Sequence, residues 1–232
     1  SVGKSLITVT ADNKTREYGE ANPQWTVTFN GFKNGESLST SGITGVPSFI
    51  TAANAFSKPD AYTINISGGS LVSDRYVFQF VNGTLNVEKA KITVRVDAKT
   101  KKYGDVNPDW TFSYSRFKNQ EVLATSDITG APSLTSDVTT SSPVGIYPIG
   151  ISAGSLGSDN YSFAFENNQI NVTKAVITIT ADDKQRDYGV ANPLFTASYN
   201  GFVNGESLAT SGISGTPELT SVANELSEVG TY

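Results

Sequence analysis

The chain has 232 residues, of which 38% are hydrophobic and 17% charged, and a formal net charge of −5. It contains no cysteine, histidine or methionine, which excludes a thiol nucleophile, an imidazole base and a zinc site built from the usual nitrogen and sulfur ligands. The negative charge argues against nucleic acid as a partner, and no run of about 18 apolar residues is present to insert into a membrane.

The first predicted element is a strand in residues 5–16. From Ile7 onward apolar and polar side chains alternate, which is the two-residue period of a half-buried strand. The polar face carries charges of both signs at Asp12, Lys14 and Arg16. We interpret this face as a solvated surface that resists pairing with other strands, in preference to a ligand patch.

The next predicted strand begins at Trp25 and alternates through Val27 and Phe29. A tryptophan here is either a core residue or a platform on which a sugar stacks. The later copies of this strand carry Trp110 and Phe195 at the same place, and a phenylalanine replacement favours the core.

The following segment, "NGESLSTSG" at residues 34–42, has the length of one short helical turn, although serine and threonine are weak helix formers. Four more strands are then predicted from alternating or β-branched side chains bounded by turn residues. They are residues 48–52, 61–67, 75–81 and 84–88.

The elements recur because the sequence repeats with a step of 85 residues. The stretch "REYGEANPQW" starting at Arg16 returns as "KKYGDVNPDW" from Lys101 and as "RDYGVANPLF" from Arg186. A unit of this length is too long for a solenoid step and sits at the small end of independently folding domains. The predicted domains are repeat 1 (1–89), repeat 2 (90–174) and repeat 3 (175–232). We expect repeat 3 to be truncated and the chain to be cut from a longer protein.

Each repeat carries a Tyr–Gly pair followed by an Asn–Pro pair. The motif residues are Tyr18, Gly19 and Pro23; Tyr103, Gly104 and Pro108; and Tyr188, Gly189 and Pro193. Glycine permits a positive φ, and Asn–Pro holds the asparagine extended, so the motif predicts a sharp corner between two strands. The tyrosine ring is expected to fill the corner, with its hydroxyl on a backbone partner. The alternative is a solvent-facing tyrosine that stacks on a sugar or peptide.

Several motifs together support a family resemblance. Within a unit, "ITVTADNKTREYG" is followed by "NP", then by "GF.NGESL" and finally by "Y.F.F.NGTL.V.KA". This combination resembles the MBG domain of the YGX type, over two whole units and most of a third. Such repeats occur in tandem in very large bacterial surface proteins and adhesins, especially those of Bacteroidota exported by the type IX secretion system. The resemblance implies an extracellular, noncatalytic array, and it brings neither a defined ligand nor catalytic residues.

The predicted fold class is therefore mainly β: tandem small β-domains, β-grasp-like or sandwich-like, with at most one short helix each, arranged as an extended rod. The rod follows from the junction, because no glycine or proline lies between Gly83 and Lys102 to make the linker flexible. We expect the array to serve as the stalk, spacer and display module of a bacterial surface adhesin. Its partners would then be the neighbouring repeats of the same chain.

A second hypothesis makes each repeat an adhesive module for a cell-surface glycan or protein, since polar loops on a β scaffold often bind ligands and repetition adds avidity. The candidate binding residues are Asn34, Glu36, Asn119, Glu121, Asn204 and Glu206. A third hypothesis is assembly by strand addition at the truncated third repeat, which we interpret as an artefact of truncation.

No cofactor and no catalytic residue are expected. The alternative is a calcium ion bound between neighbouring domains, because many extracellular arrays stiffen their junctions with calcium. Aspartates recur with the repeat and offer hard oxygen ligands. They are Asp12, Asp97, Asp182, Asp74 and Asp159. They are scattered and form no calcium-loop motif, so the sequence assigns no metal ligand.

Overall fold

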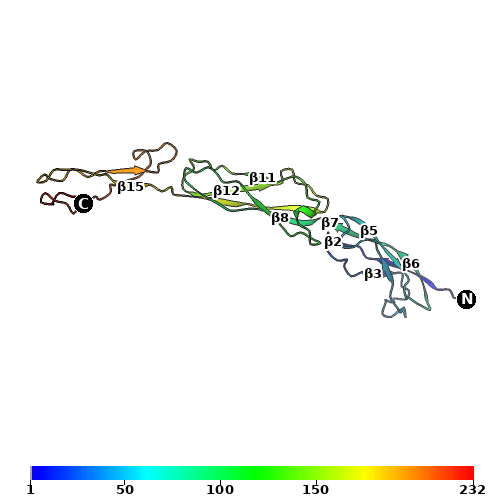
Figure 1. Cartoon of the computed structure of the whole chain (residues 1–232). Helices are drawn as coiled ribbons and strands as arrows, with labels where there is room; N and C mark the ends of the chain where they lie inside the picture. Colours follow the sequence, from blue (N-terminus) through cyan, green and yellow to red (C-terminus); the bar gives the residue numbers. More distant parts are fainter. Residues whose placement is uncertain (1) are drawn as a thin grey trace. The chain divides into compact units, whose positions relative to one another are not determined.

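The computed structural model describes residues 2–232 and consists almost entirely of β-strands joined by turns (Figure 1). The chain divides into two compact units. Unit 1 comprises residues 1–95, 112–134 and 151–166, and unit 2 comprises residues 96–111, 135–150 and 167–232. Unit 1 thus holds repeat 1 with part of repeat 2, and unit 2 holds the rest of repeat 2 with repeat 3. In the described chain, no helix has the length and apolar character needed to cross a membrane.

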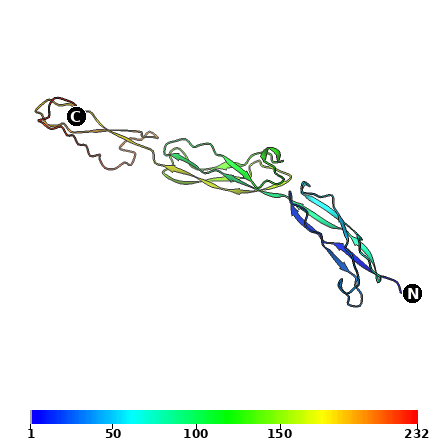
Figure 2. The ribbon, with the colours of Figure 1, turned by 60° about the horizontal axis from the view of Figure 1, so that its bottom comes forward.

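Repeat 1 consists of two sheets. Its strands are β1 (Ser5–Ala11), β2 (Lys14–Glu17), β3 (Val27–Asn30), β4 (Ser48–Ile50), β5 (Asp60–Ser67), β6 (Tyr76–Val81) and β7 (Gly83–Glu88). One sheet has the order β3-β1-β6 and the other the order β2-β7-β5-β4. Strand β1 runs parallel to β6, and β2 runs parallel to β7 (Figure 2). Because β1 and β2 are adjacent in sequence but belong to different sheets, residues 12–13 carry the chain from one sheet to the other.

The core of repeat 1 is built from every second residue of β1, β5 and β7. The buried side chains are Ile7, Val9, Ala11, Ile64, Ile66, Leu85 and Val87. Strands of the two sheets contact each other, so both sheets contribute to one core and the arrangement is sandwich-like. Each fully buried aliphatic side chain contributes roughly 1.5–3 kcal/mol of transfer free energy, which is the main stabilising term for so small a domain.

Repeat 2 copies both sheets. Its elements are β8 (Ala90–Val96), β9 (Lys99–Lys102), β10 (Phe112–Ser115), the 3-10 helix η1 (Leu123–Thr125), β11 (Ser133–Thr135), β12 (Gly145–Ser152), β13 (Tyr161–Glu166) and β14 (Asn168–Thr173). The sheet orders are β10-β8-β13 and β11-β12-β14-β9. The strand register is also copied, since Ser5 is opposite Tyr76 in repeat 1 and Ala90 is opposite Tyr161 in repeat 2.

In repeat 3 two antiparallel strands are formed, β15 (Thr178–Ala181) and β16 (Ala197–Asn200). Their register matches that of β1 with β3, since Val9 is opposite Phe29 and Ile179 is opposite Tyr199. The core side of β15 is less covered, because Ile179 is 49% exposed while Val9 is fully buried.

The strands predicted after residue 47 are confirmed, and they correspond to β4, β5, β6 and β7. The short helical turn forms in repeat 2 as η1 and in repeat 1 as a hydrogen-bonded turn, in which Thr40 N donates to Ser37 O at 3.0 Å.

The prediction of one continuous strand in residues 5–16 is wrong, because the chain changes sheets at residues 12–13 and resumes as β2. The polar face predicted for this strand is accordingly wrong at its last position. Arg16 is only 5% exposed, and its copy Lys101 is equally buried. The predicted strand from Trp25 also begins later, at Val27, and Trp25 is half-buried just before it.

Candidate functional site

The Asn–Pro half of the repeated motif is held by the buried basic residue at the end of β2. In repeat 1, Arg16 Nε donates to Asn22 Oδ1 at 2.9 Å, and Asn22 Nδ2 donates to Ala53 O at 2.8 Å. Burial lowers the pKa of Arg16 from its ordinary value, but the guanidinium remains charged at neutral pH. Repeat 3 has the same arrangement, with Arg186 Nε at 2.7 Å from Asn192 Oδ1. This side chain is therefore part of the corner, and its recurrence as Arg, Lys and Arg with the repeat step is the signal that could have identified it.

The Tyr–Gly half of the motif lies at a joint with the next repeat. Tyr18 is 4% exposed, and its hydroxyl donates to Glu121 Oε1 at 2.6 Å. The other carboxylate oxygen, Oε2, accepts from the hydroxyl of Tyr161 at 2.7 Å. The prediction of a backbone partner for the tyrosine hydroxyl is therefore wrong in repeat 1, because a carboxylate from the following repeat lies within reach.

The electrostatics of this joint favour neutral tyrosines. Burial, reinforced by the hydrogen bond to Glu121, raises the pKa of Tyr18 above its ordinary value, and the same two causes raise the pKa of Tyr161. The two rings pack edge to face with centroids 5.6 Å apart. One carboxylate thus holds a tyrosine from each repeat, and charge-assisted hydrogen bonds of this kind are roughly twice as strong as neutral ones.

Backbone and ionic contacts complete the first joint. Ala55 O accepts from Gly19 N at 3.1 Å and from Asn119 Nδ2 at 3.2 Å, so one carbonyl is shared by both repeats. Lys118 Nζ lies 3.2 Å from Glu20 Oε1 and 3.6 Å from a carboxylate oxygen of Glu17.

We call the loop that carries this glutamate the glutamate loop: residues 33–36 in repeat 1, 118–121 in repeat 2 and 203–206 in repeat 3. The loop has the same backbone in each copy, because its asparagine adopts a left-handed φ near 50° every time. These asparagines are Asn34, Asn119 and Asn204. Two of the candidate binding residues, Asn119 and Glu121, therefore belong to the joint with the preceding repeat.

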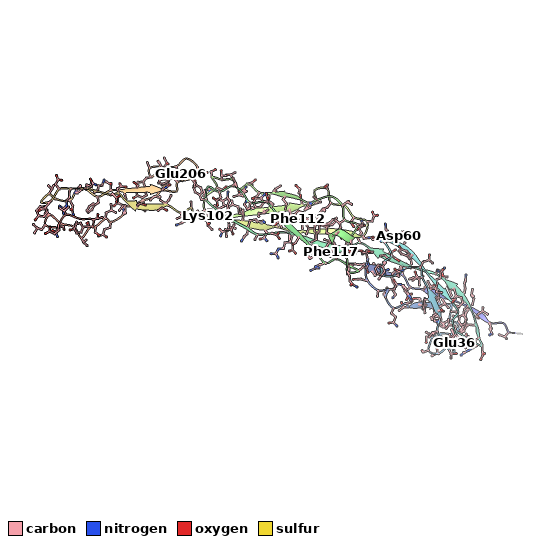
Figure 3. The ribbon with its side chains drawn as sticks, in the orientation of Figure 1. Glu36, Asp60, Lys102, Phe112, Phe117 and Glu206 are labelled. Atoms are coloured by element: carbon pink, nitrogen blue, oxygen red, sulfur yellow. The ribbon has the colours of Figure 1, made fainter. Side chains whose placement is uncertain are left out.

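The second joint lies within unit 2 and repeats the essential contacts. Tyr103 OH donates to Glu206 Oε1 at 2.6 Å. Thr140 O accepts from Gly104 N at 3.1 Å and from Asn204 Nδ2 at 3.3 Å. Figure 3 labels Glu206 and Lys102, the residue before Tyr103, in this part of the molecule.

Two sets of candidate residues lie outside these joints: the glutamate loop of repeat 1 and the Tyr–Gly–Asn–Pro motif of repeat 3. Glu36 Oε2 accepts from the hydroxyl of Tyr76 at 2.5 Å, and its Oε1 accepts from Arg75. Tyr188 is 62% exposed, in contrast to Tyr18, and a Cβ placed on Gly189 would meet no atom within 4 Å. The prolines of the motif are half-buried in repeats 1 and 2 and exposed in repeat 3: Pro23, Pro108 and Pro193.

Asp12, Asp97 and Asp182 accept hydrogen bonds from hydroxyl groups in or just before the neighbouring strand, whereas Asp159 lies 3.6 Å from Lys58 Nζ. Asp12 accepts from Thr26 Oγ1 at 2.5 Å and from Thr28 Oγ1 at 2.8 Å, and these bonds lower the pKa of its carboxyl group. Asp97 accepts in the same way from Thr111 Oγ1 at 2.5 Å. Across residues 2–232, no three Asp or Glu side chains are grouped so that they could hold a metal ion.

The strands and joints define a chain of tandem β-domains connected through a repeated Tyr–Glu contact. The family comparison identifies the domains. Three successive segments match the model of the MBG domain (YGX type), at residues 7–86, 92–171 and 177–232, and the chain belongs to this family. None of the curated proteins shows significant sequence similarity to the chain. The family is not a known catalytic family, and tandem domains of this type make the chain a repeat array of a surface-type protein.

Proposed function

We propose that this array is a noncatalytic extracellular stalk, in which each repeat acts as a spacer and helps to display another part of a bacterial surface adhesin. The neighbouring repeats of the same chain are the partners that matter for this role. The proposed location is the bacterial cell surface, and the proposed export route is the type IX secretion system, both from the family resemblance.

One observation carries the proposal: a carboxylate of one repeat accepts a hydrogen bond from the motif tyrosine of the repeat before it, at Glu121 with Tyr18 and again at Glu206 with Tyr103. A stalk needs joints that resist bending, and a charge-assisted hydrogen bond next to a shared carbonyl fixes orientation as well as distance. Binding modules that moved independently of one another would not need such contacts between repeats.

The alternative is an adhesive module for a glycan or protein. The candidate loop residues of repeat 2 are already engaged, since Glu121 accepts two tyrosine hydroxyls and Asn119 donates to Ala55 O. A ligand at this loop would have to displace the preceding repeat. These contacts therefore favour the stalk over the adhesive module.

The experiment is a measurement of distance distributions between spin labels on either side of the first joint. The chain has no cysteine, so Thr63→Cys and Ser113→Cys place labels at two exposed positions of unit 1 without competing thiols. We expect a single narrow distribution for the otherwise unchanged protein. In the Tyr18→Phe background the distribution should widen, because only the hydroxyl that binds Glu121 is removed.

The matched control is Tyr62→Phe, which removes a hydroxyl bonded within repeat 1, to Lys58 O at 2.9 Å. It should leave the distribution narrow. A broad distribution in the protein without either tyrosine substitution would overturn the proposal, because the repeats would then move independently. Saturable binding of the full chain to a glycan panel would instead favour the adhesive alternative.

A further inference from the structure

The first and the last strands of repeat 1 run parallel to each other in both of its sheets. We call β1 and β2 together with the link between them the entry segment, and β6 and β7 with their link the exit segment. In one sheet Ser5 is opposite Tyr76, and in the other Lys14 is opposite Leu85. Both pairs are 71 residues apart in the sequence. The two segments therefore keep a single register while they pass from the first sheet to the second.

Hydrogen bonds join the two segments at the change of sheet as well. Neither β1 nor β2 includes residues 12–13, where the entry segment changes sheets. There the side chain of Asn13 accepts a hydrogen bond from Thr84 N through its Oδ1 atom, at 2.8 Å. Beyond β2, Tyr18 N donates to Glu88 O at 2.8 Å. The contact between the segments thus extends from the start of β1 to the Tyr–Gly pair.

Repeat 2 has the same pairing between its entry segment, β8 with β9, and its exit segment, β13 with β14. Strand β8 runs parallel to β13 and β9 runs parallel to β14, with Lys99 opposite Ile170. An asparagine again lies at the change of sheet, where Asn168 Nδ2 donates to Val96 O at 3.0 Å. This asparagine belongs to the exit segment, whereas Asn13 belongs to the entry segment. The bond therefore recurs although the position that forms it does not.

The parallel arrangement determines how a repeat responds to tension along the chain. In a tandem array, the chain enters a repeat at the start of the entry segment and leaves it at the end of the exit segment. Because the segments are parallel, opposite pulls on these two ends act along the strands and slide the segments past each other. The hydrogen bonds between the segments run across the strands, so they share the load and have to break together. In an antiparallel pair that is pulled at its open end, the bonds break one after another.

Packing holds the same two segments together. Ile7 and Val9 of the entry segment and Leu85 and Val87 of the exit segment are at most 4% exposed. A shift of the pairing by one residue would turn these side chains toward the solvent. Sliding therefore exposes apolar surface at the same moment as it breaks hydrogen bonds, so both effects oppose the first step of unfolding.

We propose that repeats 1 and 2 are load-bearing modules, in which the parallel entry and exit segments form a shear clamp against tension along the chain. The inference rests on the proposed stalk function and adds a property to it, since a stalk that displays an adhesin is pulled whenever the adhesin holds a target. The asparagine bond belongs to the clamp, because it bears load where the strand pairing is interrupted. Resistance to unfolding by force depends on the rate of unfolding, which such interactions lower.

The test is single-molecule force spectroscopy of the full 232-residue chain, held through pairs of introduced cysteines, since the chain has none of its own. Gly3→Cys with Glu88→Cys loads the two segments of repeat 1 in shear. Asp60→Cys with Glu88→Cys instead pulls β5 from β7 at the open end of an antiparallel pair, where Asp60 is opposite Val87. All three substituted residues are exposed. At the same loading rate, we expect the unfolding force of repeat 1 to be several-fold higher for the first pair than for the second.

Asn13→Ala tests the bond at the change of sheet. It removes the acceptor of Thr84 N, so the unfolding force under shear should fall. The matched control is Asn86→Ala, because Asn86 is an exposed residue of β7 whose side chain forms no hydrogen bond within residues 2–232. This control should leave the force unchanged.

Equal forces for the two cysteine pairs would overturn the clamp, as would a shear force that Asn13→Ala leaves unchanged. The distance distribution across the first joint is measured without load, so the two proposals can fail separately. A narrow distribution together with a low shear force would remove the clamp and leave the stalk. A broad distribution together with a high shear force would remove the stalk and leave the clamp.

Discussion

The two internal joints differ in their ionic contacts but share their hydrogen bonds. In the first joint Lys118 faces Glu17 and Glu20, whereas in the second joint the corresponding residue is Val203. Both joints retain the Tyr–Glu bond and the carbonyl shared by a glycine N–H and an asparagine amide. The ion pairs are thus an addition to the joint, and the tyrosine, glycine, asparagine and glutamate are its common part.

The glycine belongs to the common part for steric as well as conformational reasons. A Cβ on Gly19 would lie 2.2 Å from Lys118 Cβ, and a Cβ on Gly104 would lie 2.4 Å from Val203 Cβ. Both contacts involve the first side-chain carbon, which cannot swing away as the end of a flexible chain can. Lysine and valine therefore fill the same space beside the glycine, whatever their charge.

The largest expected effect comes from Gly19→Ala. The left-handed φ costs roughly 1–2 kcal/mol for alanine, and the contact with Lys118 adds about 1–3 kcal/mol of overpacking. We expect the joint to open, which would release the side-chain amide of Asn119 from Ala55 O and shift its NMR signal.

Gly189→Ala is the matched control, because its φ is nearly the same while no atom lies within 4 Å of the added carbon. It should lose only the free energy that alanine requires to adopt the left-handed φ. Equal costs for the two substitutions would mean that repeats 1 and 2 are not in contact in solution.

An intermediate effect is expected from alkaline pH. The pKa values of Tyr18 and Tyr161 are raised in the folded protein above the unfolded value of about 10, so the folded joint binds protons that the unfolded chain releases. The stability gained is fully present below about pH 10 and is lost as pH rises through the higher folded pKa values. A tyrosinate absorbance titration should show these two groups ionising late.

The Tyr18→Phe variant should lack one of these late groups and should lose less stability between about pH 10 and 12. Lysine also loses its charge in this range, so the comparison is repeated with Lys118→Val in both proteins. An unchanged titration in Tyr18→Phe would contradict the burial of this hydroxyl at the joint.

The sequence predicted the repeats, most strands and the corner, because these depend on local patterns: a period of two along β1 and β5, and glycine and proline at turns. It did not predict the joint, because the partner of Tyr18 is Glu121, 103 residues further on. Glu36, Glu121 and Glu206 looked like free loop carboxylates, since polar residues in a loop give no sign of what will cover them. The burial of Arg16 was missed for a related reason, because the change of sheet at residues 12–13 leaves the alternation of residue types intact.

The smallest expected effect comes from Lys118→Val, which gives the first joint the residue that the second joint has at this position. The substitution keeps a Cβ atom against Gly19 and removes the contacts with Glu17 and Glu20, which are partly exposed. Because pairs of this kind contribute about 0–1 kcal/mol, the loss of protection at the joint should be slight, and it should vanish in about 1 M salt, where such charges are screened. Exchange rates of the Gly19 amide in low and high salt provide the measurement. A large loss that persists in high salt would mean that the lysine is part of the joint itself, and that Val203 needs some other compensation in unit 2.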